Sequence, residues 1–377
     1  MRATQHVWTE AGGWSPPLPA RDPSPQLVLA FGSPRVFRRE GLFAELAQAF
    51  PAACLGGCST AGEIQGAAVL DESLVATVVR FDHTRVKAAS VRIGDHADSR
   101  KAGAALAAAL DPAGLRHVFV LSDGLAVNGS DLVLGMTEVL PPQASLTGGL
   151  AADNDRFQET RVLASGRPAA GALEAVGFYG DRLRVGYGSM GGWDPFGPER
   201  LITSSAGNLL FEMDGKSALD LYRQYLGRHA SGLPGTGLLF PLSIRPEGSR
   251  QRVVRTVLAV DEAGKSMTFA GDIPQGSYAR LMKANPNGLV DGALGAARAA
   301  YAAGAEHPAL ALLVSCVGRR MVLKQLAEEE LEAVRGVYGP DTVLAGFYSY
   351  GEISPFCPGG VCELHNQTMT VTTLAEE

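Results

Sequence analysis

The chain has 377 residues, of which 46% are hydrophobic and 19% charged, and its formal net charge is −6. This length exceeds what one hydrophobic core usually supports, so we expect two domains. The weak negative charge, with no cluster of Lys or Arg, argues against nucleic acid or an anionic membrane surface as a partner. The N-terminus lacks the pattern of a signal peptide, and the longest apolar run, residues 309–317, is too short to cross a bilayer. We therefore expect a cytoplasmic protein.

The first part of the chain predicts an arm followed by one α/β unit. Residues 1–25 are rich in Pro and Gly and show no periodicity, which indicates a peripheral N-terminal arm. Residues 27–31 have the pattern of a buried strand and residues 36–50 that of a helix. A second short strand then enters the polar turn Gly57-Cys-Ser-Thr-Ala-Gly-Glu-Ile64. The unit is thus strand, crossover helix, strand and glycine turn.

A weaker copy of this unit lies in the middle of the chain. It is preceded by residues 74–80 and 86–93, whose alternation predicts two antiparallel strands joined by a turn at His83. The copy itself consists of a strand at 118–121, a helix at 130–140 and a turn at 148–154. We interpret its turn, which contains Asp153 and Asn154, as the counterpart of the first glycine turn.

The last part of the chain repeats the first part more closely. A strand at 311–316 and a helix at 321–337 lead to Gly346-Phe-Tyr-Ser-Tyr-Gly-Glu-Ile353, which shares the frame G-x-x-[ST]-x-G-E-I with the first turn. Such repetition reveals the building unit of a fold. The prediction is an α/β fold with two domains, internally repeated strand-helix-strand units and mixed sheets.

Polar side chains gather at the three glycine turns, and α/β sheets bind ligands at strand ends. The hydroxyl, carboxylate and amide groups of these turns can pair both the ammonium and the carboxylate of an amino acid. The candidate ligand-binding residues in the turns are Ser59, Thr60, Glu63, Asp153, Asn154, Ser349, Tyr350 and Glu352. Alternatively, Glu63 and Glu352 each hold their own turn through hydrogen bonds. The two interpretations can coexist.

Five cysteines, Cys54, Cys58, Cys316, Cys357 and Cys362, are an odd number, and a disulfide framework is not expected in a reducing compartment. The first two and the last two are spaced more widely than the C-x2-C knuckle of most zinc sites. We interpret the cysteines as small buried side chains. A thiolate site shared between the two ends of the chain is the alternative.

Two motifs typical of enzymes fail on their context. Gly186-Tyr-Gly-Ser-Met-Gly191 has the spacing of a dinucleotide-binding loop, but Pro195 and Pro198 argue against the helix that must follow. The first glycine turn misses the spacing of a nucleophile elbow by one position. Nothing in the sequence nominates a base for Cys58 or Ser59. We therefore expect no catalytic activity.

Six motifs, in the same order, resemble those of the FIST-domain family. Residues 57–64, 148–154 and 192–197 are similar to its N-terminal half, and residues 213–222, 345–353 and 364–369 to its C-terminal half. The resemblance implies a FIST N domain at 26–215 and a FIST C domain at 216–377. It also implies a bacterial sensory module of signal transduction, without catalytic residues, that binds small ligands such as amino acids. Trp193, in the third motif, joins the candidate ligand-binding residues.

Part of this family resembles haem-based nitric oxide sensors that control a partner histidine kinase or a cyclic-di-GMP enzyme. The resemblance implies a His on the strand before Gly-Gly-Trp, where this chain has Tyr187. A tyrosinate ligates ferric haem but disfavours the ferrous state, and Tyr187 is otherwise an ordinary strand aromatic. The histidines His83, His96 and His117 lie in charged surroundings, and we expect them to be solvated. Haem sensing through Tyr187 is thus the alternative to ligand sensing without a cofactor.

Overall fold

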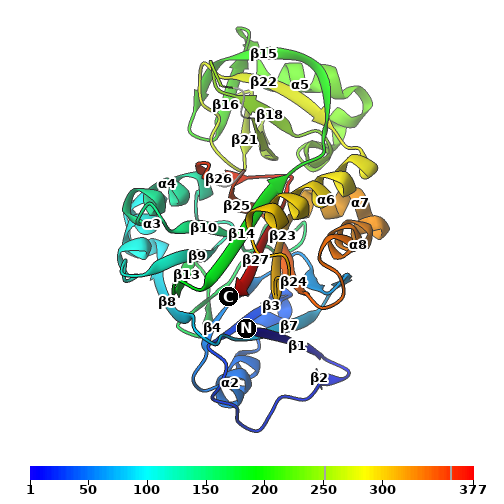
Figure 1. Ribbon diagram of the computed structural model, residues 1–377. Coiled ribbons are helices and arrows are strands. Elements are labelled where there is room, and N and C mark those ends of the chain that lie inside the picture. Colours follow the sequence, from blue (N-terminus) through cyan, green and yellow to red (C-terminus); the bar gives the residue numbers. More distant parts are fainter. Residues whose placement is uncertain (250–251, 357–358) are drawn as a thin grey trace.

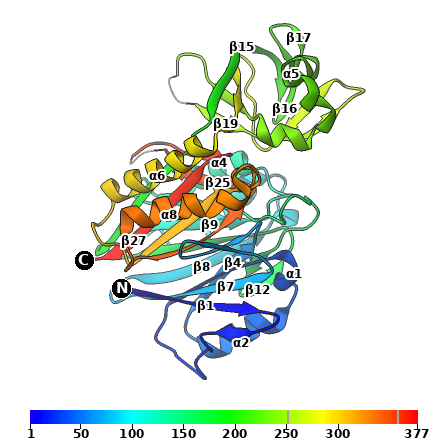
Figure 2. The same ribbon diagram turned by 90° about the vertical axis from the view of Figure 1, so that its right-hand side faces the viewer.

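Three sheets covered by helices form the body of the protein, and a smaller β domain projects from one end of it (Figure 1). The computed structural model describes residues 1–249, 252–356 and 359–377. Figure 2 shows the same division from the side, with the β domain reached through the long strand β15 (Asp194–Ala206). Within the described residues, no helix combines the length and the apolar character needed to span a membrane.

The first sheet has the strand order β12-β11-β4-β3-β7-β1-β2. Its strands are β1 (Arg2–Thr9), β2 (Gly13–Ser15), β3 (Leu27–Gly32), β4 (Cys54–Ser59), β7 (Ser73–Arg80), β11 (Val162–Ala164) and β12 (Arg167–Ala169). The parallel pair β3 and β4 is joined by α1 (Pro34–Phe37) and α2 (Glu40–Ala49). The Ser33 hydroxyl caps α1, and Pro34 suits its first turn because a proline there gives up no helical hydrogen bond.

The second sheet has the order β26-β25-β10-β9-β13-β8. Its strands are β8 (Arg85–Arg92), β9 (Leu115–Ser122), β10 (Ser145–Leu150), β13 (Ala172–Tyr179), β25 (Gly351–Pro355) and β26 (Cys362–His365). Its helices are α3 (Ser99–Ala108) and α4 (Gly129–Val139), and α4 joins the parallel pair β9 and β10. Asp98 and Asn128 accept hydrogen bonds from the first backbone N–H groups of α3 and α4.

The third sheet has the order β14-β27-β23-β24-β5-β6. Its strands are β5 (Glu63–Gln65), β6 (Ala68–Leu70), β14 (Leu183–Met190), β23 (Leu310–Cys316), β24 (Val343–Ser349) and β27 (Met369–Glu376). Its helices are α6 (Pro286–Ala303), α7 (Val317–Leu323) and α8 (Ala327–Tyr338), and the last two join the parallel pair β23 and β24. The sheet therefore combines strands from both ends of the chain.

One chain path generates all three sheets. In each copy, a first strand (β1, β8 or β14) is followed by a parallel pair with its crossover helix, then by a hairpin, and then by a return strand (β7, β13 or β27). The hairpins β5-β6, β11-β12 and β25-β26 do not pair with their own sheet but with β24, β4 and β10 of another one. This cyclic exchange gives the body a three-fold pseudosymmetry. The third copy carries the β domain between β14 and α6.

The register of the strands shows which residues correspond. Gly57, Gly148 and Gly346 lie opposite Ala30, Val120 and Leu313 in the three parallel pairs. A Cβ atom at any of these three glycines would lie 1.8–1.9 Å from the carbonyl oxygen of the residue opposite. Each copy thus needs glycine at this point, where its turn begins. The predicted equivalence of the first and last turns is confirmed, as is the mixed α/β fold with repeated units.

The β domain has its own sheet and its own core. Its elements are β15, β16 (Leu209–Met213), β17 (Lys216–Ser217), α5 (Ala218–Leu226), β18 (Leu242–Arg245), β19 (Val253–Arg255), β20 (Val257–Asp261), β21 (Ser266–Phe269) and β22 (Tyr278–Lys283). Leu210, Tyr222 and Phe269 are among the buried residues of its core. Gly215, where the sequence suggested a domain boundary, lies in the turn between β16 and β17.

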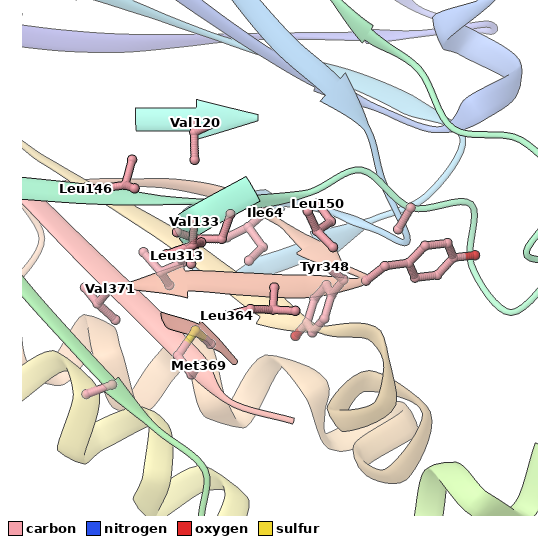
Figure 3. Packing of buried hydrophobic residues seen from close by; sticks show 14 of the residues in the cluster. Ile64, Val120, Val133, Leu146, Leu150, Leu313, Tyr348, Leu364, Met369 and Val371 are labelled. Carbon is pink, nitrogen blue, oxygen red and sulfur yellow. The ribbon is translucent and has the colours of Figure 1, made fainter. Parts of the chain in front are cut away.

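Two large hydrophobic clusters hold the body together. One cluster collects alternate residues of all three sheets, for example Phe31, Phe119 and Phe347, and the rings of Phe31 and Phe347 lie 4.6 Å apart. The second cluster lies between the other faces of the second and third sheets and their helices. Figure 3 shows part of it, with Ile64 of β5 beside residues of sheet strands and of α4. A further cluster packs α1 and α2 against the other face of the first sheet. Each sheet is therefore covered on both faces, as its apolar parallel strands require.

Two expectations from the sequence are wrong. Residues 2–9 do not belong to a peripheral arm but form β1, which pairs along its whole length with β7. The strands β7 and β8, on either side of His83, do not pair with each other; they belong to the first and second sheets. Alternation of side chains reports that a strand has two different faces, but it does not identify the neighbouring strand.

Candidate functional site

The three glycine turns meet where the three sheets come together. The Ala61 N–H donates to the Tyr348 carbonyl (2.9 Å), the Ala152 N–H to the Ser59 carbonyl (2.9 Å), and the Tyr350 N–H to the Leu150 carbonyl (3.3 Å). Each donor belongs to one turn and each acceptor to another, so the three bonds close a ring. Turns that are far apart in the sequence are thus in direct contact.

Glu63 closes the first turn. Its Oε1 accepts from the Thr60 hydroxyl at 2.6 Å, and its Oε2 accepts from the hydroxyl and the N–H of Ser73 at 2.6 and 3.3 Å. Ser59 is also buried, and its Oγ accepts from the Arg161 N–H at 3.0 Å. The polar groups of this turn are therefore bonded inside the protein.

Glu352 closes the third turn with an equivalent set of bonds. Its Oε1 accepts from the Ser349 hydroxyl at 2.7 Å, and its Oε2 accepts from the hydroxyl and the N–H of Thr368 at 2.9 and 3.1 Å. Burial raises the pKa of both Glu63 and Glu352 to about 8, against the opposing effect of these hydrogen bonds. Both carboxyl groups hold their own turns, as one of the two sequence interpretations had it.

The middle turn is longer and is closed by Asp153. Its Oδ1 accepts from the Phe157 N–H at 2.8 Å, and its Oδ2 accepts from the N–H groups of Gln158 and Glu159, both at 2.9 Å. The Tyr350 hydroxyl, from the third turn, also bonds Asp153, and the Tyr350 ring stacks on Phe157 with centroids 4.5 Å apart. The middle and third turns are therefore fastened to each other.

A cavity of about 670 Å³, which we call the turn cavity, lies beside this ring. Residues of all three copies line it: Ala61, Asp71, Glu72, Asn154, Asp155, Arg156, Val317, Arg320, Met321, Lys324 and Gln325. Of the residues that the sequence nominated, Asn154 faces this cavity. Its backbone has a φ of 67°, a conformation that asparagine adopts more readily than most residues. Tyr350 instead lines a separate cavity of about 260 Å³ beside the β domain.

The turn cavity presents charges of both signs. Arg320 is held in place because its Nη1 and Nη2 donate to the two carboxylate oxygens of Asp71 at 2.9 and 2.6 Å. Its Nη1 also donates to the Ala61 carbonyl, which connects α7 to the first turn. Lys324 and Asp155 are exposed at the rim. A fixed guanidinium, an ammonium and carboxylates are the groups that recognise a zwitterion.

Trp193 lies away from the turns. It is buried, and its Nε1 donates to the Gln367 carbonyl at 2.8 Å. The preceding Gly191 accepts a bond from Arg319, which forms a fully buried ion pair with Glu330 at 2.7 Å. This segment fastens the strand that leads into the β domain to helices α7 and α8. Trp193 lines none of the cavities described in this section.

Tyr187 lines a cavity of about 290 Å³ between α4, β14 and the β25-β26 hairpin. Its hydroxyl accepts a hydrogen bond from the Gly359 N–H at 3.3 Å. Binding sites for drug-sized ligands occupy roughly 300–1,000 Å³, so this cavity is too small for a haem, and no histidine lines it in the part of the chain that the structure describes. The residues around Tyr187 therefore do not fit a haem.

The buried histidines are engaged elsewhere. His117, which the sequence placed in solvent, is fully buried, with its Nδ1 2.8 Å from the Ser145 hydroxyl and its Nε2 3.1 Å from the Thr147 hydroxyl. Burial lowers its pKa to about 3. The sequence interpretation of His117 is wrong because it relied on the charged residues next to the start of the strand. Its ring points to the covered face of the sheet instead.

The four described cysteines, Cys54, Cys58, Cys316 and Cys362, are free thiols. Burial raises the pKa of Cys58 well above its usual range, which disfavours the thiolate that a nucleophile or a metal ligand requires. Cys357, nominated with Cys362 for a thiolate site, lies outside the described residues. Among those that are described, three or more His, Cys, Asp or Glu side chains do not gather in a way that could hold a metal ion.

The sequence analysis missed Arg320 and Asp71. A signal existed for both residues: Arg320 follows directly after a buried strand, and Asp71 follows the first glycine turn by a few residues. In an α/β protein, such positions lie at strand ends, where ligands bind. Neither residue belongs to the repeated frame G-x-x-[ST]-x-G-E-I, so the frame does not point to them.

Two family models match the chain: the FIST N domain over residues 26–216 and the FIST C domain over residues 218–355. Among solved structures, a cyanuric acid hydrolase from A. caulinodans has a TM-score of 0.35 and 12% identity, covering 100% of this chain and 99% of that one. A chorismatase has a TM-score of 0.37 and 10% identity, covering 99% and 98%. No curated protein matches the sequence.

Proposed function

Because the chain belongs to the FIST family, whose domains are sensory ligand-binding domains of signal transduction, we propose that it senses a small amino-acid-like ligand. The ligand binds in the turn cavity and undergoes no reaction there. The observation that carries this proposal is the mixed charge of a cavity to which all three copies of the repeat contribute.

The cavity offers a place for each charge of a zwitterion. Arg320 is already oriented by Asp71, so binding a carboxylate beside it would require little reordering of the guanidinium. Lys324, four residues after Arg320, adds a second positive charge, and Asp155 offers a carboxylate for an ammonium group. The side-chain amide of Asn154 can donate and accept hydrogen bonds.

The position of the cavity suits a sensor. A ligand in it would touch Ala61 of the first copy, Asn154 of the second and Met321 of the third. Binding would therefore tie the three copies together and stabilise one arrangement of them relative to others. A histidine kinase or a cyclic-di-GMP enzyme is the kind of partner that would read this change.

The absence of catalysis is part of the proposal. The two candidate nucleophiles lie in unsuitable surroundings: Cys58 is fully buried, and the Ser59 oxygen accepts a bond from a backbone N–H. An activated nucleophile needs a base within hydrogen-bond reach. Haem-based sensing of nitric oxide receives no comparable support, because the surroundings of Tyr187 do not fit the macrocycle.

A thermal-shift screen of the natural amino acids tests the proposal, followed by calorimetric titration of those that stabilise the protein. Lys324→Gln and Asp155→Asn each remove one charge at the rim while keeping the size of the side chain. We expect each to weaken binding at least five-fold. Lys101→Gln, an exposed residue on α3 that lines none of the cavities, is the matched control and should bind as the natural protein does.

The proposal is wrong if no amino acid binds, or if both charge variants bind as tightly as the control. A change of the ligand during incubation, detected by mass spectrometry, would instead contradict the absence of catalysis.

A further inference from the structure

The three-fold pseudosymmetry creates three equivalent contacts between sheets, which we call seams. In each seam, the first strand of one sheet (β1, β8 or β14) lies against a hairpin and a parallel strand of another sheet. The strand register places three residues at equivalent positions of the three copies: Gln5 of β1, Ala88 of β8 and Tyr187 of β14. They pair with Thr77, Val176 and Thr372, which hold the same place in the three return strands. The same position thus carries three side chains of different size and chemistry.

In two of the seams this side chain takes up part or all of the space. Gln5 Nε2 donates to the Leu344 carbonyl at 3.1 Å and lies 3.3 Å from the Thr77 hydroxyl. Tyr187 leaves the cavity of about 290 Å³ described above. The third seam has only the methyl group of Ala88, and here the cavity reaches about 840 Å³. We call it the seam cavity; α2, β4, β8 and the β11-β12 hairpin surround it, toward the lower part of Figure 1.

A second difference between the seams is a buried acid. Glu174 corresponds to Val75 and Thr370 in the other two copies. Val75 is apolar, and the Thr370 hydroxyl is satisfied by the Ser189 hydroxyl at 3.1 Å. Glu174 lines the seam cavity, is 1% exposed, and its Oε2 has no hydrogen-bond partner. Buried polar atoms are almost always paired, so this oxygen can take a further hydrogen bond from a ligand.

The remaining lining indicates the chemistry of the missing partner. Ala44, Ala47, Ala53 and Ala89 give the wall an apolar surface of small side chains. The hydroxyls of Ser90 and Ser165 lie 3.3 Å apart and are already close enough to bond each other. Glu40 and Arg167 also line the cavity and add one charge of each sign, but Glu174 forms no ion pair with Arg167 or with another described cation. A carboxylate in such a place is costly unless a positive charge pairs with it.

We propose that the seam cavity is a binding site for a small organic ammonium ion. Its ammonium group pairs with the carboxyl group of Glu174, and its alkyl part lies along the alanine wall. This site lies away from the turn cavity and shares no lining residue with it, so the inference goes beyond the proposed function. Burial raises the pKa of Glu174 well above its usual range, against the opposing effect of a hydrogen bond from the Gly57 backbone. Pairing with an ammonium ion would favour its ionised form.

Calorimetric titration of the full chain with n-pentylamine and 1,5-diaminopentane tests the site, with N-acetylpentylamine as the neutral control. We expect both amines to bind and the acetylated compound not to bind. Ala88→Tyr introduces, at an exposed strand position, the side chain that occupies the equivalent seam, and should abolish binding. Ala88→Ser leaves the cavity open and should retain it. Glu174→Gln removes the charge and should weaken binding at least ten-fold.

The proposal is overturned if neither amine binds, if the neutral compound binds equally well, or if Ala88→Tyr binds like Ala88→Ser. Should Glu174→Gln fail to fold, the Ala88 pair still decides the question, because that position lies on the surface. Lys324→Gln must leave amine binding unchanged. A loss of amine binding in that variant would place the amine in the turn cavity and would overturn the separate site.

Discussion

The first and third glycine turns differ from the middle one in how they use their acidic residue. Glu63 and Glu352 are fully buried. Each accepts a hydrogen bond from a hydroxyl three residues earlier, and further bonds from the residue at the start of the return strand, Ser73 or Thr368. Asp153 binds three N–H groups of its own longer loop, beside which Asn154 reaches the turn cavity. The strictly repeated turns are thus closed, and the chain can face a ligand where the repeat is broken.

This difference separates two uses of a polar turn. The frame G-x-x-[ST]-x-G-E-I places a hydroxyl three residues before a glutamate in both turns. In both turns the two side chains bond each other. The departures from the frame carry the groups that reach the cavity, such as Asn154 and Arg320. The proposed ligand site therefore draws on residues that differ between the copies rather than on residues that recur.

The largest expected effect concerns what all three turns share, the glycine at their start. Gly346→Ala places a Cβ atom 1.8 Å from the Leu313 carbonyl oxygen and must force the parallel strands apart. We expect the free energy of unfolding to fall by about 3 kcal/mol or more, measured by chemical denaturation. Gly41→Ala in α2, where a Cβ meets no atom within 4 Å, should be neutral or slightly stabilising. A loss below about 1 kcal/mol in Gly346→Ala would refute the close approach.

The contrast between closed and open turns is tested by removing their acids. Glu352→Ala leaves the hydroxyls of Ser349 and Thr368 and one N–H without a partner in a buried place. We expect a cost of about 3 kcal/mol. Asp153→Ala frees N–H groups on an exposed loop that water can reach, while the Tyr350 hydroxyl keeps its bond to the Asn154 carbonyl, so the change should cost about 1 kcal/mol. Equal costs in denaturant unfolding would remove the distinction between the turns.

The dependence of stability on pH sharpens the same contrast. The pKa of Glu63 and Glu352 rises from 4.5 to about 8 on folding. Between these values the folded protein holds more protons than the unfolded one, so the free energy of unfolding falls as the pH rises. Glu63→Gln should remove a decline on the order of 3 kcal/mol between pH 5 and 8. The exposed Glu332→Gln should keep the slope of the natural protein, and a slope unchanged in Glu63→Gln would show that this carboxyl ionises normally.

The smallest effect on stability is expected at the rim of the turn cavity. Lys324 is exposed, and Lys324→Gln should change the free energy of unfolding by less than about 0.5 kcal/mol. Its effect should appear only in the presence of ligand, as a smaller rise of Tm than the natural protein shows. A loss of stability without ligand as large as that of Asp153→Ala would mean that Lys324 supports the fold rather than the ligand.

The sequence determined the repeating unit and the places of its turns. The buried runs at residues 27–31 and 311–316, the crossover helices and the glycine frames are local patterns, and local patterns report burial, helical period and backbone freedom. They also offered the internal bonds of Glu63 and Glu352 as one of two interpretations, because a hydroxyl three residues before a carboxylate can reach it within one turn.

Only the tertiary structure decided which strands pair and what the cavities contain. The exchange of hairpins brings Asn154 and Arg320 to one cavity and sends β7 and β8 to different sheets. No periodicity records such choices, because a strand shows the same alternation beside any neighbour. The seam cavity depends on the same exchange. No sequence pattern marks Ala88 or Glu174; only the comparison with the equivalent seams, which carry Gln5 and Tyr187, shows that Ala88 leaves space there.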